Sequence, residues 1–271
     1  MDQRPIGVFD SGLGGLTAVR EMRRLMPSEN IIYFGDTSRV PYGGRSPEIL
    51  LKYARQDVHF LRSFDIKAVL VACGTVSTTA LPQLQAENDL PILGVVEPAC
   101  RKAAAMTRNR RVGLIATAAS VRSGAYQRSL RQLDPDIAVT AKACPLFVPL
   151  VENGRFRRGD VVIETVAREY LEPLRREGLD TLILGCTHYP LLTDIIGHIM
   201  GPGVTLINTG EEAAWELKRT LRGLDLLAPE GPAGRATLCA SDQPEQFGVM
   251  ASYFLGESLT RPVQPVDIDR Y

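Results

Sequence analysis

The sequence predicts an α/β protein made of two similar doubly wound parallel-sheet lobes that face each other across a central cleft. Short apolar runs recur along the chain, and each is followed by a stretch with helical periodicity. The runs are apolar throughout rather than alternating, which is typical of parallel strands covered on both faces. The expected strands are Ile6–Phe9, Ile31–Phe34, Ala68–Ala72, Ile92–Val96, Val112–Ala116, Thr181–Leu184 and Val204–Ile207.

The helical stretches between these runs have recognisable ends and faces. Leu16–Met26 stops before Pro27, and Asp160–Glu177 stops near Gly178, as helices commonly do. The one loose linker is Leu227–Gly234, which is rich in proline and glycine. A further stretch places five apolar side chains on one helical face, namely Leu50, Tyr53, Ala54, Val58 and Leu61.

A weak internal symmetry divides the chain into two parts. In the first half, one strand ends at Asp10-Ser11 and a later one at Cys73-Gly74-Thr75. In the second half, one strand ends at Thr117, with Ser120 close behind, and a later one at Cys186-Thr187-His188. Two lobes facing each other would explain this repeat. We expect residues 1–97 and 209–271 to form the first lobe and residues 98–208 to form the second.

The composition limits the partners and the compartment. The 271 residues include 31 Lys and Arg and 31 Asp and Glu, so no global field recruits nucleic acid or an anionic membrane. No apolar run reaches 18 residues, and the first residues lack the apolar segment of a signal peptide. Five widely spaced cysteines, an odd number, favour reduced thiols in the cytoplasm. The sequence does not specify the oligomeric state, and a homodimer is one assembly it allows.

The glycine-rich segment Asp10–Thr17 follows the first expected strand. It has three interpretations: a substrate-site loop, a structural turn, or a dinucleotide loop with Asp36 as the ribose-binding acid. Against the dinucleotide loop, Thr17 stands at the third glycine position. Asp10 also places a negative charge where a pyrophosphate would lie. The segment alone does not decide among the three.

Cys73 lies at the carboxyl end of an apolar strand, where Thr75 or Ser77 can cap the following helix. Unpaired N–H groups at a helix N-terminus favour a thiolate. The alternative is a buried cysteine that packs as a small hydrophobe, and for an isolated cysteine this is the better interpretation.

Cys186 also follows an apolar strand, and this second occurrence favours a functional role for both cysteines. Pro190 suits the first turn of the next helix, and His188 is close enough to exchange a proton with the thiol. Two thiols at equivalent strand ends suit stereoinversion, in which one base removes an α-proton and an opposed acid returns one to the other face. Asp10 and His188 are the natural assistants, one for each thiol.

Other interpretations of the two thiols fit less well. A zinc site needs three or four clustered ligands, and a thiol oxidoreductase usually has Cys-x-x-Cys. Cys100, Cys144 and Cys239 have no companion motif and are taken as structural. The loop Pro41-Tyr42-Gly43-Gly44 can present N–H groups and a phenol to a carboxylate, or be an ordinary turn.

With these residues in view, the chain closely resembles the glutamate racemases of the aspartate/glutamate racemase superfamily over almost its whole length. The similar segments are Ile6–Leu16, Val40–Gly43, Ser123–Tyr126, Pro149–Glu152 and Leu184–Pro190. The resemblance implies cofactor-free interconversion of L- and D-glutamate, which supplies the D-isomer for bacterial peptidoglycan.

The resemblance also implies roles for individual residues. Cys73 would act on the α-proton of D-glutamate and Cys186 on that of L-glutamate, assisted by Asp10 and His188. The implied substrate contacts are Ser11, Tyr42, Gly43, Thr75, Thr117 and Thr187, and we add Asp10, Gly74, Glu152 and His188 as candidates.

Three departures from the family pattern are present. Gly74 stands where the family usually has Asn, Ser120 stands where Thr is more usual, and Asn208-Thr209 replaces a more common Asp-Ser. Three alternatives remain: a racemase for aspartate or another amino acid, a catalytically inactive amino-acid-binding regulator, and a nucleotide-dependent oxidoreductase.

Overall fold

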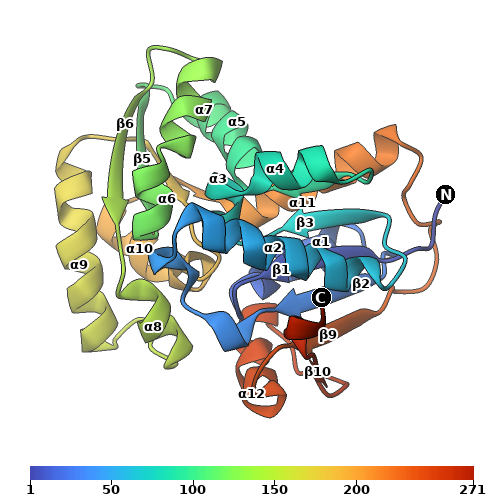
Figure 1. Cartoon of the computed structure of the whole chain (residues 1–271). Coiled ribbons are helices and arrows are strands. Elements are labelled where there is room, and N and C mark those ends of the chain that lie inside the picture. The colour runs from blue at the N-terminus through green and yellow to red at the C-terminus, as the bar shows by residue number, and fades with distance from the viewer.

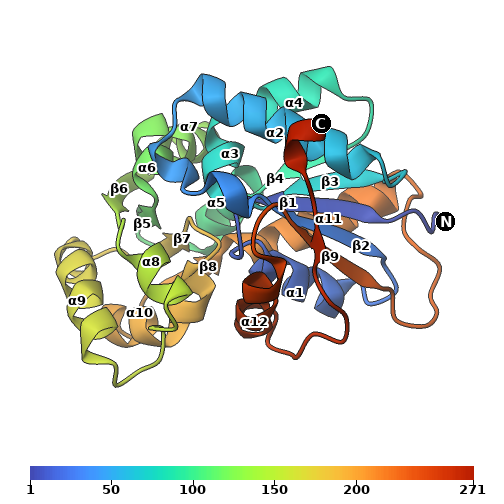
Figure 2. The ribbon, with the colours of Figure 1, turned by 60° about the horizontal axis from the view of Figure 1, so that its bottom comes forward.

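Two parallel sheets organise the computed structural model, which describes all residues 1–271 (Figures 1 and 2). The larger sheet has the strand order β10-β9-β2-β1-β3-β4 and the smaller one β6-β5-β7-β8. Every pairing is parallel, which confirms the predicted fold class. The strands are β1 (Ile6–Asp10), β2 (Ile31–Gly35), β3 (Ala68–Val71), β4 (Ile92–Gly94), β5 (Arg111–Ala116), β6 (Ala138–Ala143), β7 (Thr181–Leu184), β8 (Thr205–Asn208), β9 (Ala236–Ala240) and β10 (Gln264–Pro265).

All seven expected strands are present, but the prediction missed β6, β9 and β10. Strand β6 lies at a sheet edge, and its residues are exposed or half-buried. An edge strand can alternate polar and apolar side chains, so the search for uninterrupted apolar runs passed over it. Strand β4 is shorter than expected because a helix begins at Val96.

Helices cover both faces of the larger sheet (Figure 2). Val8 packs in the core formed with Leu16 and Met22 of α1, whereas its neighbour Phe9 packs with Leu61 of α2 on the opposite face. The helices of this part are α1 (Leu16–Leu25), α2 (Pro47–Arg62), α3 (Gly74–Thr79), α4 (Leu81–Glu87), α11 (Thr209–Gly223) and α12 (Pro244–Leu255), with the 3-10 turns η1 (Thr37–Arg39), η2 (Tyr42–Gly44) and η4 (Ile268–Arg270).

The smaller sheet is covered in the same way. Leu182 packs with α9 and α10 on one face, and its neighbour Ile183 packs with α5 and α7 on the other. The helices of this part are α5 (Val96–Met106), α6 (Ala118–Ser123), α7 (Ala125–Leu133), α8 (Phe147–Glu152), α9 (Val161–Arg176), α10 (Thr193–Met200) and η3 (Tyr189–Leu192).

The strands of each sheet come from one of the two predicted segments. The larger sheet draws on residues 1–97 and 209–271, and the smaller sheet on residues 98–208. The boundary at 97/98 lies in the first turn of α5. These bounds for the two lobes remain our proposal.

Local signals explain several helix ends. Ser46 caps α2 by accepting from the N–H of Ile49, and Asp160 caps α9 by accepting from that of Val162. The predicted caps of the helix after Cys73 are wrong, since Cys73 itself is the N-cap residue. The hydroxyl of Thr75 instead meets that of Thr117, and that of Ser77 donates to a carbonyl of β3.

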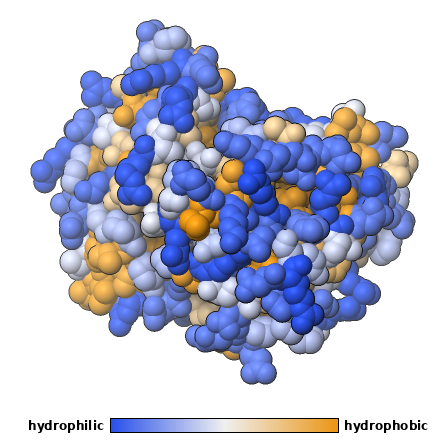
Figure 3. Space-filling view, in the orientation of Figure 1, coloured by the Kyte–Doolittle hydropathy of each residue, from blue (hydrophilic) through white to orange (hydrophobic).

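The surface and the helix lengths add two observations. Polar and charged side chains cover most of the face seen in Figure 3. None of the helices combines the length and the apolar character that a membrane crossing requires.

Candidate active site

The carboxyl ends of β1, β3, β5 and β7 converge on a cavity of about 440 Å³ between the two sheets. Convergence at this edge is expected of doubly wound sheets. Every candidate site residue named from the sequence lines it: Asp10, Ser11, Tyr42, Gly43, Cys73, Gly74, Thr75, Thr117, Glu152, Cys186, Thr187 and His188.

Cys73 lies between β3 and α3 and is only 4% exposed. Its thiol lies 3.9 Å from the hydroxyl oxygen of Ser11. Burial, followed by the negative charge of Asp10, raises the pKa of the Cys73 thiol to about 12. The N–H groups at the start of α3 act in the opposite direction but do not prevail. The helix N-terminus therefore favours a thiolate on Cys73, as expected, but burial and the charge of Asp10 outweigh it.

Asp10 ends β1 and is almost fully buried. Its carboxylate accepts a 3.0 Å hydrogen bond from the N–H of Gly12, which holds the turn after the strand. Burial raises the pKa of Asp10, while the positive charge of His188 acts against that rise. Asp10 is therefore able to take up a proton close to Cys73.

Cys186 has a cationic neighbour instead. Nδ1 of His188 lies 3.9 Å from the Cys186 sulfur, and Nε2 lies 2.8 Å from Oε1 of Glu152. Burial lowers the pKa of His188, but the contacts with Cys186 and Glu152 outweigh it and raise the pKa to about 10. The imidazole is thus held as a cation 3.9 Å from the Cys186 sulfur.

Glu152 was expected among the substrate contacts. Its carboxylate lines the cavity but is occupied by His188. A negative charge there would also repel the carboxylates of an acidic amino acid. The sequence offered no sign of this pairing, because the two residues are 36 positions apart.

The loop at Tyr42 presents main chain rather than a phenol. The Tyr42 hydroxyl donates to the buried carboxylate of Asp36 and lies 3.3 Å from that of Asp57. Asp36 is further bound by Arg39, at 2.5 Å, and by Ser241, at 3.0 Å. Asp36 is thus engaged by protein partners, contrary to the ribose-binding role that the dinucleotide interpretation requires.

Hydroxyl groups connect the two sides of the cavity. The oxygens of Thr75 and Thr117 are 3.1 Å apart, and Thr117 lies 3.1 Å from the hydroxyl of Ser120. The main chain at Gly74 also lies against the loop that carries Cys186, since a Cβ at position 74 would lie 2.7 Å from the carbonyl oxygen of Gly185. The main chains beside the two thiols are therefore in direct contact.

Cys144 also lines the cavity, although the sequence assigned it a structural role. It follows β6, the edge strand that the prediction missed, so its place at the carboxyl edge could not be inferred. Burial raises the pKa of the Cys144 thiol to about 12. No cluster of three or more His, Cys, Asp and Glu side chains suited to a metal ion is present.

Comparison with known proteins gives consistent matches. Residues 17–217 match the Asp/Glu/Hydantoin racemase family. The glutamate racemase of Geobacter metallireducens is 46% identical over 96% of this chain and 95% of its own length. The structure of glutamate racemase isoform RacE1 from Bacillus anthracis superposes with a TM-score of 0.93 at 37% identity, covering 98% of both chains. That of Francisella tularensis glutamate racemase in complex with D-glutamate gives 0.90 at 35% identity, covering 100% of both.

Proposed function

Because the chain belongs to the Asp/Glu/Hydantoin racemase family, we propose that it interconverts L- and D-glutamate, with Cys73 and Cys186 as the two bases. The observation that carries this proposal is the placement of the thiols. They follow the carboxyl ends of β3 and β7, which belong to different sheets, and both line one cavity. Thiols that reach one α-carbon from two sides can remove and return a proton on opposite faces.

The charges around the thiols suggest how conversion of L-glutamate proceeds. The Cys186 thiolate, paired with the His188 cation, removes the α-proton and becomes a thiol. The Cys73 thiol then gives its proton to the other face and becomes a thiolate. Asp10, with its raised pKa, is placed to exchange a proton in the Cys73 region. Conversion of D-glutamate runs through the same steps in reverse.

The remaining polar groups of the cavity are proposed to hold the substrate. They are the hydroxyl groups of Ser11, Thr75, Thr117 and Thr187 and the main chain at Tyr42, Gly43 and Gly74. For Glu152 we propose an indirect role through His188. We propose glutamate rather than aspartate as the substrate because the relatives described above are named glutamate racemases.

The experiment is a racemisation assay without added cofactor. Dialysed, chelator-treated protein is incubated with L-glutamate, and the circular dichroism signal of the amino acid is followed until racemisation brings it to zero. We expect full activity, and slow or no change with L-aspartate. A need for pyridoxal phosphate, a nicotinamide cofactor or a metal would contradict cofactor independence. Faster reaction with aspartate would favour a racemase for aspartate. An inactive protein that still binds glutamate would favour the regulator.

Three broader assignments belong to the same proposal. The D-isomer would serve peptidoglycan synthesis, as the resemblance implies. All five cysteines are unpaired, which suits the reducing environment of the cytoplasm. A homodimer is the assembly that we propose to test, by light scattering of the protein with and without glutamate.

A further inference from the structure

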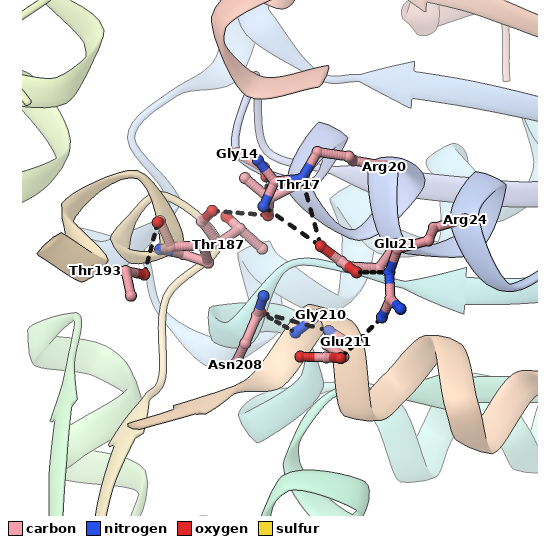
Figure 4. Close-up of polar contacts among 11 residues, drawn as sticks. Gly14, Thr17, Arg20, Glu21, Arg24, Thr187, Thr193, Asn208, Gly210 and Glu211 are labelled. Atoms are coloured by element: carbon pink, nitrogen blue, oxygen red, sulfur yellow. Dashed lines mark hydrogen bonds and ion pairs between the residues drawn. The ribbon is translucent and has the colours of Figure 1, made fainter. Parts of the chain in front are cut away.

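A buried hydroxyl group joins helix α1 of the first sheet to the loop that carries Cys186. Thr17, in the first turn of α1, is 1% exposed. Its hydroxyl oxygen lies 2.9 Å from the carbonyl oxygen of Gly14 and 2.9 Å from that of Thr187 (Figure 4). Thr187 is the residue between Cys186 and His188, so this contact reaches the main chain that connects the thiol to its imidazole.

Gly14 makes a second close contact with the same loop. A Cβ at position 14 would lie 2.1 Å from the hydroxyl oxygen of Thr187 and 2.5 Å from Nδ1 of His188. Nδ1 is the atom that faces the Cys186 sulfur. The first lobe therefore abuts both residues that follow Cys186, and only a glycine leaves room for them.

The other polar contacts on this side of α1 are more exposed. Arg24 pairs with Glu21 at 2.9 Å and with Glu211 at 2.8 Å (Figure 4), but its side chain is 55% exposed. Ion pairs of this kind contribute little because solvent screens them. The buried Thr17 hydroxyl is better placed to define the position of the Cys186 loop.

We propose that Thr17 is a positioning residue for the Cys186–His188 pair, an inference that rests on the racemase function proposed above. Its single hydroxyl proton, when donated to Thr187, restrains the main chain between the sulfur and the imidazole. Proton transfer requires the reacting groups to be well placed, and a shift of about 1 Å can cost roughly 100-fold in rate. The loss of this contact should thus slow the step at Cys186 more than the step at Cys73.

The test compares Thr17→Val, which keeps the shape but removes the hydroxyl, with Thr17→Ser, which keeps the hydroxyl. We expect Thr17→Val to lower kcat by roughly tenfold with little change in KM. The α-deuterium isotope effect should grow on L-glutamate, whose proton goes to Cys186, and shrink on D-glutamate. Thr17→Ser should restore values close to those of the unchanged protein.

A matched control separates positioning from stability. The Thr107 hydroxyl donates to Asp180 at 2.7 Å, at the amino ends of β5 and β7 and away from the cavity. Thr107→Val should lower the thermal unfolding temperature without changing either isotope effect. If Thr17→Val does not fold, Thr17→Ala provides the second test, because it also removes the hydroxyl and places a smaller side chain at the same position. It should produce the same isotope-effect pattern.

Each remaining outcome has a definite meaning. Isotope effects that stay unchanged in Thr17→Val, or in Thr17→Ala if it must be used, would overturn the proposal, as would a Thr17→Ser variant as slow as Thr17→Val. A larger effect on D-glutamate would also overturn it, because the hydroxyl would then act through the Asp10 turn. Failure of the unchanged protein to racemise glutamate would instead refute the proposed function before any variant is compared.

Discussion

Cys73 and Cys186 occupy equivalent places, each directly after a central strand of a parallel sheet, but their surroundings carry opposite charges. Cys73 has the Asp10 carboxyl group nearby, and its pKa is raised to about 12. Cys186 has His188 beside it, held as a cation by a pKa of about 10. The same arrangement of strand and cysteine thus occurs in two different acid–base environments. We expect a free protein with Cys73 as a thiol and with a cationic imidazole beside Cys186.

The largest expected effect comes from removing either thiol. Cys73→Ser and Cys186→Ser should each lower racemisation by roughly 1000-fold or more, since a serine hydroxyl is a far poorer acid and base at neutral pH. Circular dichroism starting from each enantiomer measures the rates. A control, Cys239→Ser, removes a buried thiol of β9 outside the cavity and should retain activity. Near-normal activity in either cavity variant would mean that the two thiols are not the bases.

Replacing Asp10 and His188 in turn tests whether each residue assists only one of the two thiols. Asp10→Asn and His188→Asn should each slow the reaction by roughly 100-fold. Since L- and D-glutamate have equal free energy in water, kcat/KM must stay equal in both directions for every variant. Isotope effects escape this constraint. We expect Asp10→Asn to enlarge the α-deuterium effect on D-glutamate and His188→Asn to enlarge it on L-glutamate. Matching changes in both variants would refute the one-to-one pairing.

The strands and the two thiols were predictable because both depend on local pattern. A central parallel strand is apolar throughout, and a cysteine at its end stands out against that background. Edge strand β6 lacks the pattern, so Cys144 was not placed at the cavity. The fold could therefore be inferred except at the sheet edges and near the C-terminus.

The environments of the site residues were not predictable, because they depend on partners distant in sequence. The Tyr42 hydroxyl lies 3.3 Å from the carboxylate of Asp57 only because α2 packs beside the loop. Glu152 reaches His188 from the end of helix α8. The high pKa of Cys73 follows from burial, which outweighs the local helix N-terminus. Local sequence thus identified the residues but not the charges around them.

Gly74 tests how closely the two thiol environments must approach. A Cβ here would lie 2.7 Å from the carbonyl oxygen of Gly185, a main-chain atom that cannot simply rotate away. Gly74→Ala should therefore separate the loops and lower kcat by roughly tenfold. Gly223→Ala is the matched control, since nothing lies within 4 Å of its added Cβ. Unchanged kcat in Gly74→Ala would show that the main-chain contact between the loops is dispensable.

Glu152→Gln should have the smallest effect, because it weakens only one of the two contacts that keep His188 charged. The pKa of His188 is raised to about 10 from a usual value of 6.5. Its charge-dependent stabilisation is therefore complete below about pH 6.5 and is lost as the pH rises through about 10. Removing the Glu152 charge lowers this pKa, so the cation beside Cys186 is lost at a lower pH.

The measurement is the pH profile of kcat/KM, which reports the groups of the free enzyme. We expect the alkaline limb of Glu152→Gln to move to lower pH, with less than about a tenfold loss at pH 7. The loss is small because the Glu152 side chain is 38% exposed and Cys186 still contacts the imidazole. Glu87→Gln, which removes a surface charge paired with Arg55, should leave the profile unchanged. An alkaline limb that stays in place or moves upward would show that Glu152 does not hold His188 charged, and the contrast between the thiols would then rest on the Cys186–His188 contact alone.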